Sequence, residues 1–326
     1  MIANPVYLDC DTGIDDALAL GYLLTGPTDL VDLVGVGTVH GNVSAAGGAE
    51  NTRRLLALAG RDVPVATGAS DPLVGAFAGG AVEVHGTDGV GEVRERLLPP
   101  VREQDAATQD AADLLIDLSH RHAGRLHVLA IGPLTNLAVA LERDPTLVDR
   151  VAHVTVMGGA AMVAGNIGPV TEANIGHDPE AAQVVVTAGW QVTLVPLDTT
   201  MENTFEASDI AALQASDVPF VAAVGEMLDY YSDFYRDIYG RRCCALHDPL
   251  AAAVALGEVE LLRAPKVPVV VDTTDGPGRG QTVCDLRHQR PAAGRHDVDV
   301  DGATVRVVMR CADGFADLLR TRLLEM

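Results

Sequence analysis

Four aspartates crowd into eight residues near the N-terminus, in the stretch DCDTGIDD at 9–16. Like charges at this spacing repel each other unless a positive charge lies among them. Carboxylate oxygens favour a hard divalent cation such as Ca²⁺ or Mg²⁺. Helix capping by Asp15 or Asp16 would explain one or two of the four carboxylates, but not Asp9 and Asp11 as well. An EF-hand is excluded, because a predicted strand precedes the cluster and Leu20 stands at loop position twelve. The stretch therefore predicts a cation site.

Each further predicted strand is also followed by a polar or glycine-containing motif. These motifs are HGN at 40–42, IGP at 131–133, MGG at 157–159 followed by GNIGPVTEAN at 165–174, and DTT at 198–200. Ligands of open parallel sheets bind beyond the carboxyl ends of the strands, so all these motifs are expected to border one site. Asn42, Asn166, Glu172 and Asn174 offer the hydrogen-bonding groups that sugar hydroxyls need. Each of them is also a residue type that loops carry for solubility alone.

Two His-Asp-Pro motifs, at 177–179 and 247–249, both have the form of a helix start with Asp as the N-cap. The local residues do not distinguish a functional histidine from a structural one. His85 lies in the Gly-rich segment 72–93, which we expect to be a long, exposed surface loop. Cys243 and Cys244 precede His247, and core packing explains them better than a reactive thiol does.

The elements that must position these residues alternate between strands and helices. Strands are predicted at 6–8, 33–39, 126–131, 153–157 and 191–197, and helices at 15–24, 44–59, 108–122, 135–143 and 178–189. The alternation predicts an α/β fold, with a mostly parallel, Rossmann-like open sheet flanked by helices on both faces. The C-terminal third adds a mostly helical segment at 207–262, strands at 267–272, 281–286 and 303–309, and a closing helix at 314–325. Without a visible linker, residues 1–326 are expected to form a single domain.

Composition excludes several classes of partner. The 326 residues carry 45 acidic and 23 basic side chains, a formal net charge of −22, which disfavours nucleic acid and anionic membranes. There is neither a signal-peptide pattern nor an apolar run of about 18 residues. The five cysteines contain no C-x-x-C pair, which argues against a disulfide framework or a zinc cluster. These features predict a cytoplasmic protein that acts on a small neutral or cationic ligand.

The motifs DCDTGIDD, HGN, MGG, GN…TEAN and the second HDP resemble, in this order, the calcium-dependent nucleoside hydrolases, the inosine-uridine-preferring nucleoside N-ribohydrolases. The resemblance runs from about residue 5 to the C-terminal helix. It implies hydrolysis of the N-glycosidic bond of ribonucleosides to ribose and a free nucleobase. It also implies a homodimer or homotetramer.

The resemblance assigns a role to each motif. Asp11, Asp16 and Asp248 are expected to ligate Ca²⁺ through carboxylates, and Ile131, where the family often has Thr, through its main-chain carbonyl. Asp11 is also expected to be the general base toward a Ca²⁺-bound water, and His247 to help the nucleobase leave. The residues expected to bind the nucleoside are Asp15, Asn42, Asn166, Glu172 and Asn174 at the ribose hydroxyls, Met157 along the pocket and His85 on the base side. Asp9 and the first HDP motif are expected to be structural.

This chemistry suits an oxocarbenium-like transition state, which needs negative charge near the sugar, an activated water and a proton for the departing base. The chain departs from the pattern at Ala173, where some relatives have an aromatic residue, and in YGRRCC at 239–244, which replaces a more apolar stretch. His247 resembles members that accept uridine and inosine broadly. A broad or pyrimidine- and inosine-accepting specificity is therefore expected.

Two other functions fit parts of the sequence. A phosphotransferase of the haloacid dehalogenase type also begins with a strand and D-x-D, with Asp9 as nucleophile, Asp11 as acid/base and Mg²⁺ bound. Its pattern wants Thr or Val where this chain has Gly13. A non-catalytic nucleoside- or ribose-binding protein on the same scaffold would keep every motif.

Overall fold

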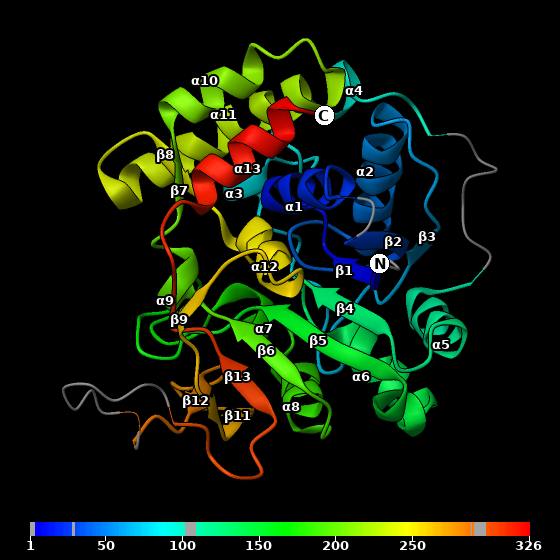
Figure 1. The fold of residues 1–326 in the computed structure, drawn as a ribbon, viewed down its shortest axis with the longest axis vertical. Helices are drawn as coiled ribbons and strands as arrows, with labels where there is room; N and C mark the ends of the chain where they lie inside the picture. The colour runs from blue at the N-terminus through cyan, green and yellow to red at the C-terminus, as the bar shows by residue number, and fades with distance from the viewer. Residues whose placement is uncertain (1–3, 28–29, 102–108, 288, 290–297) are drawn as a thin grey trace.

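One eight-stranded sheet runs through the molecule (Figure 1). The computed structural model describes residues 4–27, 30–101, 109–287, 289 and 298–326. The strand order is β10-β13-β6-β5-β4-β1-β2-β3. The strands are β1 (Asn4–Cys10), β2 (Val31–Thr38), β3 (Val65–Thr67), β4 (Leu126–Ala130), β5 (Val151–Met157), β6 (Val192–Val195), β10 (Lys266–Val267) and β13 (Val305–Val307). Every neighbouring pair is parallel except β10 with β13. The predicted mostly parallel α/β sheet is confirmed.

Helices cover both faces of this sheet, which explains why its strands are apolar on both sides. One hydrophobic cluster lies under α1 (Ile14–Leu24), α2 (Ala45–Leu58), α11 (Pro219–Tyr239), α12 (His247–Ala255) and α13 (Phe315–Leu324). The other lies under α5 (Ala111–Arg121), α6 (Thr135–Arg143) and α8 (Pro179–Thr187). Each helix lies close to its predicted position, although Thr108, the first residue predicted for the helix at 108–122, falls outside the described residues.

The remaining elements are short. They comprise α3 (Val82–His85), α4 (Arg94–Leu97), α7 (Ala173–His177), α9 (Leu197–Thr200) and α10 (Ala207–Gln214), and the strand pairs β7 (Thr204–Glu206) with β8 (Cys243–Ala245), β9 (Leu261–Arg263) with β14 (Arg310–Cys311), and β11 (Val269–Val271) with β12 (Thr282–Cys284). The segment 207–262 is mostly helical, as predicted, with α10, α11 and α12 separated by short turns, β8 and the first residues of β9. Of the predicted C-terminal strands, the third supplies β13 to the main sheet and the other two form the hairpin β11–β12. Among the described residues, no helix is both long and apolar enough to cross a membrane.

The helix starts next to the predicted site differ in their caps. Gly13 is the N-cap of α1, and Asp16 accepts a hydrogen bond from the Gly13 amide at 2.7 Å, so this aspartate does close the first turn. Asp178 caps α8 as predicted. Asp248 is not an N-cap, because Leu246 takes that position and Asp248 lies in the first turn of α12. Its carboxylate is thereby left to other partners.

The prediction of an exposed loop over 72–93 is wrong for its second half. His85, at the end of α3, is only 4% exposed, and Val90 and Val93 are buried in the first hydrophobic cluster. The His85 Nδ1 atom accepts a hydrogen bond from the Ile14 amide at 3.0 Å. An amide at the first turn of α1 lacks an intrahelical partner, and His85 supplies one. The segment is therefore fastened to the start of α1.

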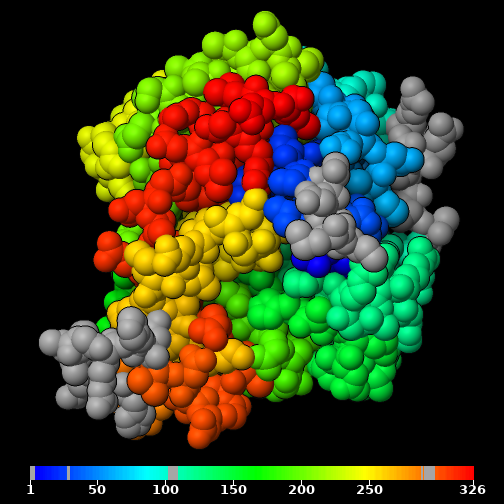
Figure 2. All heavy atoms as spheres, viewed as in Figure 1, coloured from blue at the N-terminus to red at the C-terminus, as the bar shows by residue number. Residues whose placement is uncertain are grey.

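The C-terminal helix α13 packs against α1 (Figure 2), and a largely buried ion pair ties it to Glu258, just after α12. Arg322 donates to Glu258 at 2.7 Å, and its guanidinium lies over the Tyr22 ring at 4.3 Å. The Tyr22 hydroxyl donates to the same carboxylate at 2.8 Å. The side chains of Arg322 and Glu258 are 12% and 14% exposed, so solvent screens this pair weakly.

We expect Glu258→Gln to lower the free energy of unfolding by about 1–3 kcal/mol at neutral pH, since the hydrogen bonds to a charged acceptor are lost. Hydrogen bonds and the charge of Arg322 lower the pKa of Glu258, although burial opposes them. A lowered folded-state pKa contributes stability above the unfolded value, about 4.3, and this contribution disappears as the pH falls through the folded value. Urea unfolding at pH 7 and pH 3 should therefore show a difference that vanishes in acid. An equal difference in unfolding free energy between wild type and Glu258→Gln at both pH values would mean that the charge of Glu258 does not contribute to stability.

Candidate active site

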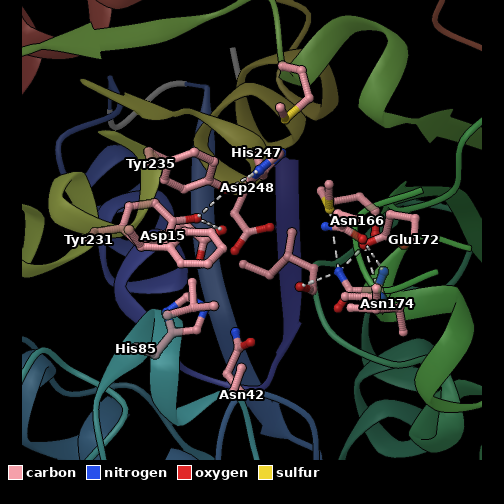
Figure 3. Close-up of a pocket in the computed structure, with 18 of the residues that line it drawn as sticks. Asp15, Asn42, His85, Asn166, Glu172, Asn174, Tyr231, Tyr235, His247 and Asp248 are labelled. Carbon is pink, nitrogen blue, oxygen red and sulfur yellow. Dashed lines mark hydrogen bonds between the residues drawn. The ribbon is translucent and has the colours of Figure 1, made fainter. Parts of the chain in front are cut away.

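A pocket of about 390 Å³ opens at the carboxyl ends of the strands, where the sequence motifs converge (Figure 3). Ten of the twelve predicted site residues line it: Asp15, Asn42, His85, Ile131, Met157, Asn166, Glu172, Asn174, His247 and Asp248. Figure 3 shows Tyr231, Tyr235 and His85 on one side, Asn166, Glu172 and Asn174 on the other, and Asp248 between them. The volume is typical of a small-molecule site. Asp11 and Asp16, the other two predicted residues, lie beneath this surface.

The pocket floor is acidic and buried. Carboxylate oxygens of Asp15, Asp16 and Asp248 lie within 4.8 Å of one another. Burial, and then repulsion from Asp15, raises the pKa of Asp16 to about 7 and that of Asp248 well above its usual range. One oxygen of Asp15, Oδ1, is buried without a hydrogen-bond partner among the described residues. A divalent cation would satisfy this oxygen and neutralise the repulsion, so the donor set fits Ca²⁺ or Mg²⁺.

Asp11 lies next to this trio rather than inside it. Its Oδ2 accepts a hydrogen bond from the main-chain N–H of Asn42 at 2.7 Å. Its Oδ1 accepts one from the side-chain Nδ2 of Asn42 at 3.1 Å. The same Nδ2 donates to Asp16 Oδ2 at 3.2 Å. Burial and then the charge of Asp16 raise the pKa of Asp11 well above its usual range. Asn42 therefore joins the Asp11 and Asp16 carboxylates and covers Asp11 on the pocket side.

The opposite wall is polar and held by α7. Glu172 is the N-cap of this helix, with Oε1 accepting from the Asn174 amide at 2.9 Å and Oε2 from the Gly159 amide at 2.9 Å. Burial raises the pKa of Glu172 to about 7. Asn174 Nδ2 donates to the Ile131 carbonyl at 2.9 Å and to the Met157 carbonyl at 3.1 Å. The Ile131 carbonyl, a predicted cation ligand, is thereby presented beside the polar wall.

His247 connects to the acidic floor through two tyrosines of α11. Its Nε2 lies 2.7 Å from the Tyr235 hydroxyl, and its Nδ1 lies 2.7 Å from Thr200 Oγ1. The Tyr235 and Tyr231 hydroxyls are 3.4 Å apart, and Tyr231 donates to Asp15 Oδ2 at 3.1 Å. Burial lowers the pKa of His247 to about 4, so the ring is neutral near pH 7. The result is a continuous row of hydrogen-bonding groups from Thr200 to Asp15.

The tyrosines are functional candidates that the sequence reasoning missed. Tyr231, Phe234, Tyr235 and Ile238 line the pocket at positions i, i+3, i+4 and i+7 of α11. This spacing puts them on one face of a helix. The signal was present in YYSDFYRDI, as a dense aromatic stripe in a chain with only 4% aromatic residues. The His85 ring stacks on Tyr231 at 5.3 Å, which brings α3 to the same face.

Several other sequence candidates lie away from the pocket or play a different part in it. Asp9 accepts from the Tyr7 hydroxyl at 2.9 Å and from Asn136 Nδ2 at 3.1 Å, and it does not line the pocket. The phosphotransferase reading needs Asp9 as its nucleophile, so this position argues against it. Burial raises the pKa of the Cys244 thiol, which argues against a thiolate. Of the first HDP motif, Asp178 is a helix cap, yet the His177 ring does line the pocket.

Comparison with known proteins agrees with this geometry. The family model for inosine-uridine preferring nucleoside hydrolase matches residues 6–314. Uridine nucleosidase 1 of Arabidopsis thaliana is 36% identical over 82% of this chain and 77% of its own length. The inosine-uridine preferring nucleoside hydrolase of Leishmania major is 35% identical over 90% of this chain and 92% of its own length. The solved structure of a plant nucleoside hydrolase superposes with a TM-score of 0.87 at 31% identity, covering 99% of both chains. The chain therefore belongs to the inosine-uridine preferring nucleoside hydrolase family.

Proposed function

We propose that this protein hydrolyses the N-glycosidic bond of ribonucleosides, with release of ribose and a free nucleobase. The observation that carries the proposal is the pocket itself, which sets an acidic floor between a polar wall and an aromatic wall. A sugar fits between the floor and the polar wall, and a base fits beside the tyrosines. An oxocarbenium-like sugar is stabilised by nearby carboxylates. Family membership supports the same reaction.

The cation of the proposed reaction is Ca²⁺, held by the carboxylates of Asp11, Asp16 and Asp248 and by the Ile131 carbonyl. The buried acidic cluster and the orphaned Asp15 oxygen support a divalent ion at this floor. When bound, Ca²⁺ would polarise a water and hold ribose hydroxyls. Asp15, a member of the same cluster, would then bind a sugar hydroxyl through its carboxylate.

Asp11 is the proposed general base, which takes a proton from the attacking water at a carboxylate oxygen. Its contact with Asn42 supports a place beside the sugar, since Asn42 itself lines the pocket. The bond from Asn42 Nδ2 to Asp11 Oδ1 must open before a water reaches that oxygen. Asn42, Asn166, Glu172 and Asn174 are the proposed ligands of the ribose hydroxyls. Met157 closes the wall behind them.

His247 and Tyr235 are the proposed proton donors to the departing base, and His85 contacts the base side from α3. A nucleobase anion is a poor leaving group, so protonation contributes strongly to its departure. The 2.7 Å contact between Tyr235 and His247 supports a shared proton at the base end of the pocket. From Tyr235 the row of hydrogen-bonding groups continues through Tyr231 to Asp15.

We expect His247→Ala to lower kcat on uridine or inosine by about 10²- to 10⁴-fold, the range of general acid catalysis. A nitrophenyl riboside carries its own good leaving group, so its hydrolysis should fall less than tenfold. Tyr235→Phe should show the same contrast. Tyr239→Phe, one turn along α11, is the matched control, because its hydroxyl donates to the Met201 carbonyl and not to His247. Equal losses on both substrates would remove the leaving-group role.

The proposed specificity is broad, or pyrimidine- and inosine-accepting, and is supported by the names of the relatives in Arabidopsis and Leishmania. We also propose a single catalytic domain, since strands from both ends of the chain enter one sheet. A cytoplasmic location is supported by five unpaired cysteines. A homodimer or homotetramer is the proposed assembly, and light scattering after gel filtration would establish it.

A reducing-sugar assay tests the proposal directly. Uridine, inosine, adenosine, guanosine and cytidine are supplied separately, each with Ca²⁺ and after exhaustive chelation. Free ribose that appears only with Ca²⁺ is the expected result, and the order of rates gives the base preference. Tight nucleoside binding without any ribose would instead favour a binding protein on this scaffold.

A further inference from the structure

A second cavity, of about 280 Å³, adjoins the proposed nucleoside pocket behind His177. The His177 ring lines both cavities. His40 and Phe77 line the second cavity and not the first, together with the Gly-rich backbone of 74–80. His177 is thus a partition between the two spaces. The proposed function gives no role to this residue or to the space behind it.

The second cavity presents an unused hydrogen-bond acceptor. The Thr135 hydroxyl donates its proton to Asp178 Oδ2 at 2.7 Å. The Thr135 oxygen must then accept from His40 Nε2, which lies 3.1 Å away. Burial lowers the pKa of His40, so the ring is neutral and its Nδ1 carries no proton. No hydrogen bond to this Nδ1 is formed within the described part of the chain.

His177 also has hydrogen-bonding capacity that the protein leaves unused. Its Nδ1 is buried without a partner among the residues that the structure describes. Such orphaned groups are rare in native proteins, and water or a ligand commonly satisfies them. Burial lowers the pKa of His177 to about 4, so at neutral pH the ring can both donate and accept a hydrogen bond.

The pocket geometry places one end of the sugar at His177, provided that the proposed function holds. With the base beside Tyr231 and Tyr235 and the 2′,3′-diol over the acidic floor, the C4′–C5′ bond points away from the tyrosines. Asn166 and Glu172 lie on the wall at that end (Figure 3), and His177, which also lines the pocket, ends the helix α7 that Glu172 caps. We propose that His177 is a specificity-determining residue that hydrogen-bonds the 5′-hydroxyl and, as a partition, excludes nucleosides with a larger C5′ substituent.

The charges around the second cavity indicate which C5′ substituents could enter it if the His177 ring were absent. The Asp178 and Asp71 carboxylates act on His40 from this side. Arg279, the guanidinium at the rim, is already paired with both oxygens of Glu180, at 2.8 and 3.0 Å. Among the described residues that line this cavity, a 5′-phosphate therefore finds no free guanidinium or ammonium group. A small neutral group such as an ester would fit once the His177 ring is removed.

The test compares kcat/KM on uridine, 5′-deoxyuridine and 5′-O-acetyluridine, or on the inosine series if inosine is the better substrate. Wild type should prefer the 5′-hydroxyl over the 5′-deoxy compound and discriminate strongly against the acetyl ester. His177→Ala should shrink the hydroxyl preference by about three- to tenfold, the worth of one neutral hydrogen bond. It should also raise activity on the acetyl ester at least tenfold over wild type, because the two cavities then join.

His177→Phe is the matched control, since it keeps the partition and removes the hydrogen bond. It should lose the hydroxyl preference and still reject the ester. His177→Leu, which also fills the space without a polar atom, serves in its place if His177→Phe melts well below wild type. An unchanged hydroxyl preference in His177→Ala, with no gain on the ester, overturns the inference. Absence of ribose from uridine in wild type is a different result, because it contradicts the proposed function itself.

Discussion

Replacing Asp11 with Asn is expected to lower kcat on uridine by about 10³- to 10⁴-fold at saturating Ca²⁺, with a smaller change in KM. The amide keeps the shape of the carboxylate, and it can still contact Asn42. It cannot accept a proton from water, nor supply a charged ligand to the cation. Initial rates of ribose release over a Ca²⁺ titration provide the measurement. A partial recovery at high Ca²⁺ would separate the ligand role of Asp11 from its role as base.

Asp9→Asn is the matched control, because Asp9 lies in β1 only two residues before Asp11. Asp9 is equally buried, but its partners are Tyr7 and Asn136 rather than pocket residues. We expect kcat within tenfold of wild type and a lower melting temperature. Loss of all turnover in Asp9→Asn, with turnover kept in Asp11→Asn, would reverse the assignment of the two aspartates. That result would revive a reaction with Asp9 as the nucleophile.

Removal of Ca²⁺ is expected to abolish ribose release and to lower the melting temperature by about 5 °C or more. At 100-fold excess over its Kd, a ligand that binds only the folded state stabilises it by about 2.7 kcal/mol. Asp248→Asn should remove this response, because Asp248 belongs to the buried trio. Without Ca²⁺ the same variant should melt above wild type, since one buried charge has been deleted among like charges. Differential scanning calorimetry with and without chelator measures both effects.

A control aspartate with similar burial shows whether the loss of the Ca²⁺ response is specific to Asp248 or follows from replacing any buried aspartate. Asp209 is 7% exposed and accepts from the Glu206 amide at 2.8 Å, remote from the proposed cation ligands in sequence and contacts. Asp209→Asn should lower the melting temperature with or without Ca²⁺, and leave the Ca²⁺ shift intact. A Ca²⁺ shift of wild-type size in Asp248→Asn would contradict the assignment of Asp248 as a cation ligand.

Much of the fold could be predicted because its signals are local. Five strands and five helices of the first two thirds follow from apolar runs, helical spacing and caps such as Asp178. The strand β3 was missed because it has only three residues, too few to show a pattern. The C-terminal strands were found, but their partners were not predictable. Whether a strand such as β13 pairs with β6 or with a neighbour depends on contacts over more than 100 residues.

The candidate site was predictable where residues follow strands, and less so elsewhere. Asn42, Ile131 and Met157 gather because parallel strands end at one edge, a rule that needs no contact information. Tyr231 and Tyr235 reach the pocket from the middle of a long helix, whose direction the sequence does not give. His85 is held in the interior by a hydrogen bond from one amide of α1. His177 is positioned by the short helix α7. These positions follow from tertiary packing.

The distance along the chain between the acidic residues has a consequence for synthesis in the cell. Asp16 and Asp248 lie side by side in the fold but 232 residues apart in the sequence. At a synthesis rate of about 5–20 residues per second, the first aspartates leave the ribosome roughly 10–50 s before their last partner. The strand β13 and the helix α13 follow later still. The nascent chain must therefore remain incompletely folded until Asp248 and these later elements have been made, and the proposed ion-binding centre cannot assemble before then.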